Sequence, residues 1–169
     1  APAATPGVIG LIDECAIPKK GAKTPGVKRQ YCGATGKVDN CLVNVHLAYL
    51  GQGLKTLIDS DLFLPEDWAA DPARCREAHL PEDATHRPKT TIALDQVRRA
   101  LGNGLRFDFF TFDAGYGKSP AFLFELEALG QLYVGEVPCS FRCWPQLPQY
   151  HSRRREFAVL DEFVALLMH

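Results

Sequence analysis

Residues 8–14 are Val-Ile-Gly-Leu-Ile-Asp-Glu and residues 107–117 are Phe-Asp-Phe-Phe-Thr-Phe-Asp-Ala-Gly-Tyr-Gly, two apolar runs that each end in an aspartate. Both runs are short and rich in β-branched or aromatic residues, so each predicts a buried strand rather than a helix. The sequence therefore predicts that Asp13 and Asp113 lie at the ends of two buried strands, at a margin of the sheet that a ligand can reach.

The chemistry of these two aspartates depends on whether their strands are neighbours. Converging carboxylates repel each other unless a proton or a cation lies between them. Hard divalent cations such as Mg²⁺ prefer oxygen ligands, and a pair of such ions can promote both attack and departure at a phosphodiester. An aspartate after a strand can equally be a turn former or a helix cap, so the residues leave both interpretations open.

The segments around the two runs predict an α/β protein in the order βββ-α-β-α-β. Apolar periodicity, proline and glycine set the boundaries of each element. The predicted elements between and after the two runs are strands over 27–32, 38–50 and 54–64, a short helix near 71–78, a helix over 90–101, a helix over 119–129 and a strand over 132–137.

Two parts of the chain are expected from this order. Residues 1–138 would form the core, with residues 65–90 as an acidic, proline-rich connection inside it. Residues 139–169 would form a C-terminal extension. Apolar residues recur at helical spacing over 157–167, which predicts a helical tail.

Charge is segregated along the sequence although the formal net charge is only −1. From Ala16 to Lys37 there are six lysines and arginines and no acid, whereas eight acids occur from Asp59 to Asp83. A basic loop of this kind could hold DNA phosphates, which would position nucleic acid without determining sequence preference. The candidate phosphate-binding residues are Lys19, Lys20, Lys23, Lys28 and Arg29, with Lys118 close after the second aspartate.

Composition excludes several classes of protein. The chain has 169 residues, of which 46% are hydrophobic and 23% are charged, as in an ordinary globular domain. No apolar run is long enough to span a membrane. The first residues lack the features of a signal peptide, and the six cysteines form no CxxC motif, so we expect reduced thiols and a cytoplasmic protein.

The sequence resembles the bacterial insertion-sequence transposases of the DDE superfamily over about residues 8–144. The resemblance is carried by an ordered series of short blocks rather than by any single motif. The blocks include Ile12-Asp13-Glu14, Pro18-Lys19-Lys20-Gly21, Arg29-Gln30-Tyr31-Cys32-Gly33, Gly36-Lys37-Val38, Asn40-Cys41, Pro81-Glu82-Asp83 and Asp113-Ala114-Gly115-Tyr116-Gly117. Cys15 and Leu42 depart from the family, which commonly has Thr or Ser and Gln at these places.

The resemblance implies a ribonuclease-H-like mixed sheet, which agrees with the order βββ-α-β-α-β. It also implies a DNA transposase core that hydrolyses phosphodiesters and transfers strands with Mg²⁺ or Mn²⁺. Asp13 matches the first acidic residue of the family and Asp113 the second. DNA is the implied partner, and a homodimer on DNA is a further expectation.

The third acid of the family, a glutamate on a later helix, has no clear match in this sequence. Glu156 and Glu162 are the candidates by order along the chain, so we expect a truncated core that could be inactive. One alternative is a non-catalytic remnant or regulator that binds DNA or a transposase. The other is a different metal-dependent nuclease that uses Glu14 with Asp13 and Asp113, although alternation should point Asp13 and Glu14 to opposite faces of a strand.

Overall fold

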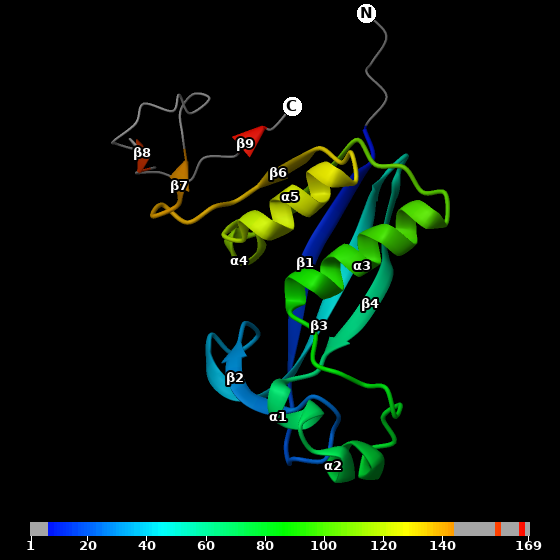
Figure 1. Ribbon diagram of the computed structural model, residues 1–169, viewed down its shortest axis with the longest axis vertical. Coiled ribbons are helices and arrows are strands. Elements are labelled where there is room, and N and C mark those ends of the chain that lie inside the picture. The colour runs from blue at the N-terminus through cyan, green and yellow to red at the C-terminus, as the bar shows by residue number, and fades with distance from the viewer. Residues whose placement is uncertain (1–6, 144–157, 160–165, 168–169) are drawn as a thin grey trace, which may run out of the picture.

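A computed structural model describes residues 7–143, 158–159 and 166–167 of the chain. It forms a mixed α/β arrangement in which four strands come first and helices then alternate with shorter strands (Figure 1). The strands are β1 (Ile9–Pro18), β2 (Lys28–Cys32), β3 (Lys37–Gly51), β4 (Leu54–Phe63), β5 (Phe109–Phe112), β6 (Tyr133–Gly135), β7 (Arg142–Cys143), β8 (Ala158–Val159) and β9 (Leu166–Leu167). The helices are α1 (Glu66–Ala69), α2 (Pro72–Glu77), α3 (Lys89–Gly102), α4 (Ala114–Gly117) and α5 (Pro120–Ala128).

The main sheet has seven strands in the order β2-β3-β1-β5-β6-β9, with β4 also paired to β3. The long strand β3 is the central strand of the antiparallel part, because it pairs with β1, β2 and β4. Strand β1 then pairs in parallel with β5, and β5 in parallel with β6. This arrangement makes β1 the strand at which the antiparallel and parallel parts meet.

The core lies between the sheet and the helices α3 and α5, which lie on the same side of it (Figure 1). Alternate residues of each strand point to this side, as the pleat requires. Strand β3 contributes Val45 and Leu47, and α3 contributes Ile92 and Val97, all of them fully buried. The predicted helix over 90–101 is thus confirmed, and its apolar stripe is the surface that packs on the sheet.

Local capping explains where two of the helices begin. The Asp71 side chain accepts a hydrogen bond from the Arg74 N–H at the start of α2, and the Ser119 side chain accepts one from the Phe122 N–H at the start of α5. A proline follows each capping residue, at a position where no helical N–H partner is needed. Both helices were predicted, and both are confirmed.

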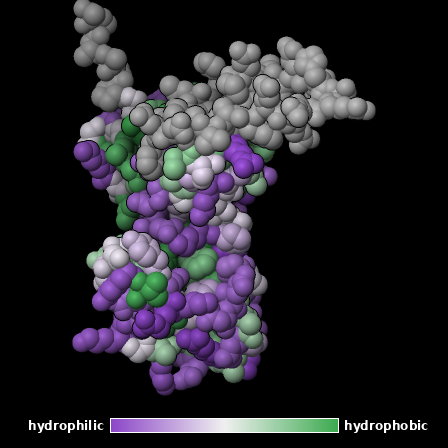
Figure 2. Space-filling model, turned by 90° about the vertical axis from the view of Figure 1, so that its left-hand side faces the viewer, coloured by the Kyte–Doolittle hydropathy of each residue, from purple (hydrophilic) through white to green (hydrophobic). Residues whose placement is uncertain are grey.

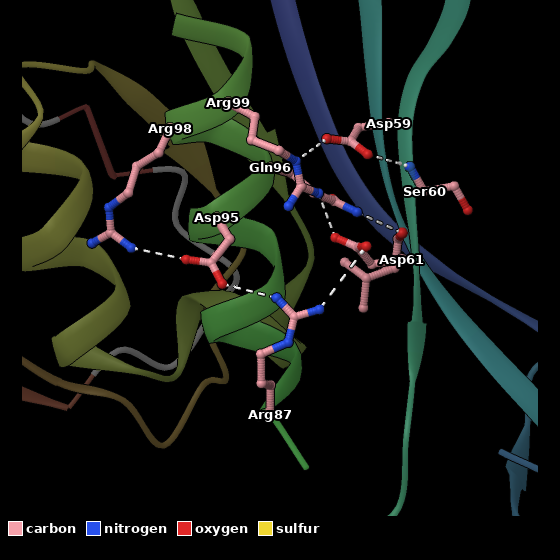
Figure 3. A network of polar contacts seen from close by, with 9 residues as sticks. Asp59, Ser60, Asp61, Arg87, Asp95, Gln96, Arg98 and Arg99 are labelled. Atoms are coloured by element: carbon pink, nitrogen blue, oxygen red, sulfur yellow. Dashed lines mark hydrogen bonds and ion pairs between the residues drawn. The ribbon is translucent and has the colours of Figure 1, made fainter. Parts of the chain in front are cut away.

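A charged network fastens α3 to its neighbours (Figure 3). Arg99 of α3 pairs with Asp59 and Asp61 of β4, and Arg98 pairs with Glu125 of α5. The buried amide of Gln96 donates to the Val45 carbonyl of β3 at 2.9 Å. These contacts fix the position of α3 relative to the sheet and to α5.

A second, smaller core lies around Trp68 in α1. The indole is fully buried, its N–H donates to the Val27 carbonyl at 2.8 Å, and the Arg74 guanidinium lies 3.7 Å from the ring centre. Leu64 and Cys75 complete this cluster. Residues 65–90 are therefore packed against the start of β2 and form an ordered connection.

Several predictions about the elements need correction. The first strand does not end at Asp13 but continues to Pro18, because it stays paired with β3 beyond its apolar part. All four strands predicted before α3 are present, so the order βββ-α-β-α-β leaves out one strand, the short β2. The short helices α1 and α4 were not predicted.

The predicted tail helix over 157–167 also differs from the structure. The described residues of that segment, Ala158–Val159 and Leu166–Leu167, form strands. Strand β9 pairs with β6, which extends the main sheet by one short edge strand. The candidates Glu156 and Glu162 lie outside the described residues.

Candidate active site

Asp13 and Asp113 lie on neighbouring strands. The last pair of the parallel ladder between β1 and β5 is Ile12 with Phe112, so the two aspartates are the next residues of their strands. Ile12 and Phe112 are both buried in the core, whereas both aspartates are exposed. The two strands are therefore neighbours, which is the condition on which convergence of the two carboxylates depended.

Asp13 has a fixed backbone because it lies inside β1. It is paired with His46 of β3, and its Oδ1 atom accepts a hydrogen bond from the Glu14 N–H at 2.7 Å. Within the described residues Asp13 makes no ion pair. Its second carboxylate oxygen thus remains available to a ligand from solution.

Asp113 begins the short helix α4 and caps it. Its Oδ1 atom accepts a hydrogen bond from the Gly115 N–H at 2.8 Å. The interpretation of this residue as a helix cap is therefore correct as far as one oxygen is concerned. A carboxylate has two oxygens, so capping leaves the other one free for a cation.

Glu14 points to the helix-covered side of the sheet and has different partners. Its carboxylate accepts a hydrogen bond from the Tyr116 hydroxyl at 3.3 Å and pairs with the Lys89 ammonium at 2.5 Å. These contacts join β1 to α4 and to the first residue of α3. No partner of Glu14 was predicted from the sequence, although the alternation of side chains along β1 is enough to place Glu14 on the same side as the buried Ile12.

Tyr116 lies close enough to Glu14, Asp113 and Asp13 for all three negative charges to affect the pKa of its phenol. Burial raises the pKa of the Tyr116 phenol far above its ordinary value, and the negative charges of Glu14, Asp113 and Asp13 raise it further. Tyr116 therefore stays protonated and donates its hydrogen bond. The described residues contain no cluster of three or more acidic, histidine or cysteine side chains placed to hold a metal ion.

Comparison with known proteins agrees with this geometry. Residues 1–157 match the sequence model of the family described as DDE superfamily endonuclease. The chain belongs to the DDE superfamily endonucleases. It is also 30% identical over 128 residues to a protein from Microchaete diplosiphon named as a probable transposase for insertion sequence element IS701. That match covers 75% of this chain but only 31% of the relative, so the chain spans less than a third of the relative's length.

Membership of the DDE superfamily endonucleases makes a divalent cation the implied cofactor. Asp13 and Asp113 fit such an ion, because they supply exposed, hard oxygen ligands from adjacent strands. Two carboxylates are few for a dedicated site, and such ions complete their coordination with water or substrate oxygens.

The structure separates the predicted basic residues into two groups. Lys23 pairs with Glu77 and Lys28 with Asp67, each at 2.9 Å. These contacts raise the pKa of Lys23 and lower the pKa values of Glu77 and Asp67. The other four candidates make no ion pair with the described residues: Lys19, Lys20, Arg29 and Lys118.

Within the described part of the chain, none of the helices combines the length and hydrophobicity that crossing a bilayer requires.

Proposed function

We propose that this chain is the catalytic core of a DNA transposase, which hydrolyses and transfers strands at the ends of an insertion sequence with Mg²⁺ or Mn²⁺. The observation that carries the proposal is the position of Asp13 and Asp113, directly beyond the last pair of the parallel ladder between β1 and β5. Family membership supports it independently.

The topology supports a ribonuclease-H-like fold for this core. Apart from β2, the strands of this core lie in the order β4-β3-β1-β5-β6, and along the chain α3 precedes β5 and α5 lies between β5 and β6. Three antiparallel strands followed by α-β-α-β correspond to the order expected from the sequence, with β2 as an added short strand. We further propose residues 1–138 as the core and 139–169 as an extension.

Asp13 and Asp113 would hold the cation. A divalent cation there would polarise the scissile phosphate and make water a better nucleophile near neutral pH. The protein contributes rigidity to this arrangement: β1 fixes Asp13 through its ladder with β3, and the cap of α4 fixes one oxygen of Asp113. Glu14 holds α4 in place from the helix-covered side of the sheet, because it accepts a hydrogen bond from Tyr116 of that helix.

The third acid remains a proposal that rests on order along the chain, with Glu156 and Glu162 as candidates. DNA is the proposed substrate, the cytoplasm the proposed location, and a homodimer on DNA the proposed assembly. Lys118, at the end of α4, is proposed to contact a phosphate close to the cation.

A non-catalytic DNA-binding remnant is the second candidate function. It is favoured by the lack of a three-ligand metal cluster among the described residues. A nuclease that uses Glu14 as a third metal ligand is less well supported, because Glu14 is engaged by Lys89 and Tyr116.

Nicking of supercoiled plasmid in Mg²⁺ or Mn²⁺ tests the proposal. We expect the wild type to nick, and Asp13→Asn and Asp113→Asn to abolish nicking. Asp83→Asn is the matched control, since Asp83 is an exposed aspartate outside the site, and it should nick like the wild type.

Binding of Mn²⁺ to the same proteins, followed by electron paramagnetic resonance, provides a readout besides activity. Weaker Mn²⁺ binding by both site variants, with normal binding by Asp83→Asn, would support the metal site. Mn²⁺ binding without nicking by the wild type would favour the remnant. Equal nicking by all four proteins would overturn the proposal.

A further inference from the structure

Tyr31 of β2 is the most exposed of the large hydrophobic side chains in the described part of the chain, at 67%. Val38, directly opposite on β3, is 56% exposed. In the view of Figure 2, hydrophilic residues cover most of the described surface and hydrophobic ones show in separate small areas. Such a cross-strand pair of an aromatic residue and a valine adds modestly to the stability of the two strands, and it also presents apolar surface that a partner can cover.

The backbone that presents Tyr31 is held firmly. The other side of β2 faces the protein: Lys28 pairs with Asp67, the Gln30 amide donates to the Cys41 carbonyl at 3.1 Å, and Cys32 is fully buried. Because side chains alternate along a strand, Arg29 and Tyr31 must then point outward. We call β2 together with Lys37–Cys41 of β3 the arm.

Positive charge gathers at the base of the arm. Asn40 lies opposite Arg29 in the ladder, and its side-chain amide donates to the carbonyls of Lys19 and Gly21, each at 2.8 Å. The Lys19 N–H in turn donates to the Asn40 carbonyl at 2.9 Å. The turn that carries Lys19 and Lys20 is thereby fixed beside Arg29.

Lys19, Lys20 and Arg29 form no ion pair with the described residues, whereas Lys23 and Lys28 are paired with Glu77 and Asp67. The unpaired cations and Tyr31 therefore form one surface with a positive base and an aromatic tip. Phe124 of α5 is exposed to a similar extent, 65%, but Glu125 and Glu127 follow it in the sequence. Of these two exposed aromatic residues, Tyr31 is therefore the one with positive charge beside it.

The outward side of the arm is continuous with the side of the sheet that carries Asp13. Along β3, Val38, Asn40 and His46 are separated by even numbers of residues and so point to the same side, and His46 is paired with Asp13. His46 lies eight positions after Val38 along β3, so the two residues are roughly 26 Å apart at about 3.3 Å per residue. That length corresponds to about eight nucleotides of duplex at about 3.4 Å each.

We propose that the arm binds DNA beside the cleavage position, with Tyr31 stacked on an unpaired base and with Lys19, Lys20 and Arg29 on backbone phosphates. Aromatic stacking accepts any base, and lysine and arginine supply the phosphate contacts that fix the strand. This inference rests on the proposed function, because DNA is the substrate there, and it adds a contact separate from the metal-binding aspartates.

Fluorescence anisotropy with a fluorescein-labelled duplex that carries a single-stranded tail tests the arm. Tyr31→Ala should weaken binding roughly 5- to 100-fold, and Tyr31→Phe should restore it, since the ring and not the hydroxyl stacks. Phe124→Ala is the matched control and should bind like the wild type. Thermal melting checks that each variant is folded, as expected for exposed positions.

Two further measurements separate stacking from charge. 2-Aminopurine placed along the single-stranded tail should be quenched by the wild type at one or two adjacent positions, and Tyr31→Ala should remove this quenching. Arg29→Ala should reduce the slope of log affinity against log salt by about 0.7 to 0.9, while Tyr31→Ala should leave the slope unchanged.

The outcomes of these measurements distinguish a failure of the proposal for the arm from a failure of the proposed function. Wild-type DNA binding that Tyr31→Ala does not weaken would overturn the arm and leave the transposase proposal standing. A change in sedimentation from dimer to monomer in Tyr31→Ala, with unchanged DNA affinity, would also overturn it and identify a contact between copies of the chain. No DNA binding by the wild type would overturn both proposals.

Discussion

The Tyr116 hydroxyl donates a hydrogen bond to the Glu14 carboxylate at 3.3 Å and so ties α4 to β1. Asp113 precedes α4 directly, so this contact also limits where Asp113 can lie. We expect Tyr116→Phe to lower the free energy of unfolding by about 1 kcal/mol, because it removes one hydrogen bond to a charged acceptor that keeps its pair with Lys89. Urea unfolding measures this change, and an unchanged stability would show that the contact contributes nothing.

The two roles of Asp113, cap and proposed metal ligand, can be separated by two substitutions. Asp113→Asn keeps a side-chain oxygen for the Gly115 N–H but removes the charge, so it should abolish nicking with little loss of stability. Asp113→Ala should abolish nicking and also cost about 1 kcal/mol. Parallel nicking and unfolding measurements check this, and nicking by Asp113→Asn at the wild-type rate would exclude the charge from the reaction.

Gly117 is required by a close approach of two backbone segments. A Cβ atom on Gly117 would lie 1.9 Å from the Glu136 carbonyl oxygen, so Gly117→Ala must displace α4 or the end of β6. We expect a loss of more than about 2 kcal/mol of stability and a loss of nicking. Gly102→Ala is the control: no atom lies within 4 Å of its Cβ position at the end of α3, and the change should be neutral or stabilise by up to about 1 kcal/mol. Similar thermal melting of the two variants would contradict the steric argument.

Arg99 joins two aspartates of β4 in the network of Figure 3. We expect Arg99→Met to destabilise the protein by about 1 kcal/mol, since Asp59 and Asp61 then repel each other without a shared cation. The pairs are partly exposed, so the loss should shrink as salt is raised. Unfolding at low and high salt tests this, and a loss that does not depend on salt would point to lost packing instead.

The pair of Lys28 and Asp67 should make stability depend on pH in the acid range. The hydrogen bond from Lys28 holds the pKa of Asp67 below its ordinary value of 3.8. A carboxylate with a lowered pKa in the folded protein stabilises it above the unfolded pKa and loses this effect as the pH falls through the folded pKa. Asp67→Asn should therefore be less stable than the wild type at neutral pH, and the difference should disappear as the pH falls through the lowered pKa of Asp67. A constant difference in unfolding free energy from pH 7 to pH 2 would contradict this.

Apolar runs predicted where strands and helices are buried, but not how far strand pairing extends. The apolar run from Val8 to Ile12 ends at Asp13, whereas pairing of β1 with β3 continues to Pro18. Asp13 therefore lies inside a strand and not, as the apolar run predicts, at its end. The four-residue helix α4 contains two glycines, so its sequence predicts a turn and gives no helical signal.

The partners of individual charged residues could not be predicted, because they depend on register and on distant segments. Arg99 meets Asp59 and Asp61 only through the packing of α3 on β4, and Lys28 meets Asp67 only because Trp68 anchors α1 beside β2. By contrast, the adjacency of Asp13 and Asp113 could be predicted on one condition, that their strands are neighbours. The parallel pairing of β1 with β5 meets this condition.

The parallel ladder between β1 and β5 also governs when the proposed site can exist. Ile12 and Phe112 pair across about a hundred residues of chain, so this ladder must close a long loop, which makes it slower to form than the adjacent β3–β4 hairpin. During synthesis the two carboxylates cannot meet until residues beyond Asp113 have left the ribosome. A nascent or prematurely ended chain is thus unable to assemble the pair, and the proposed DNA cleavage is restricted to molecules that have completed the sheet.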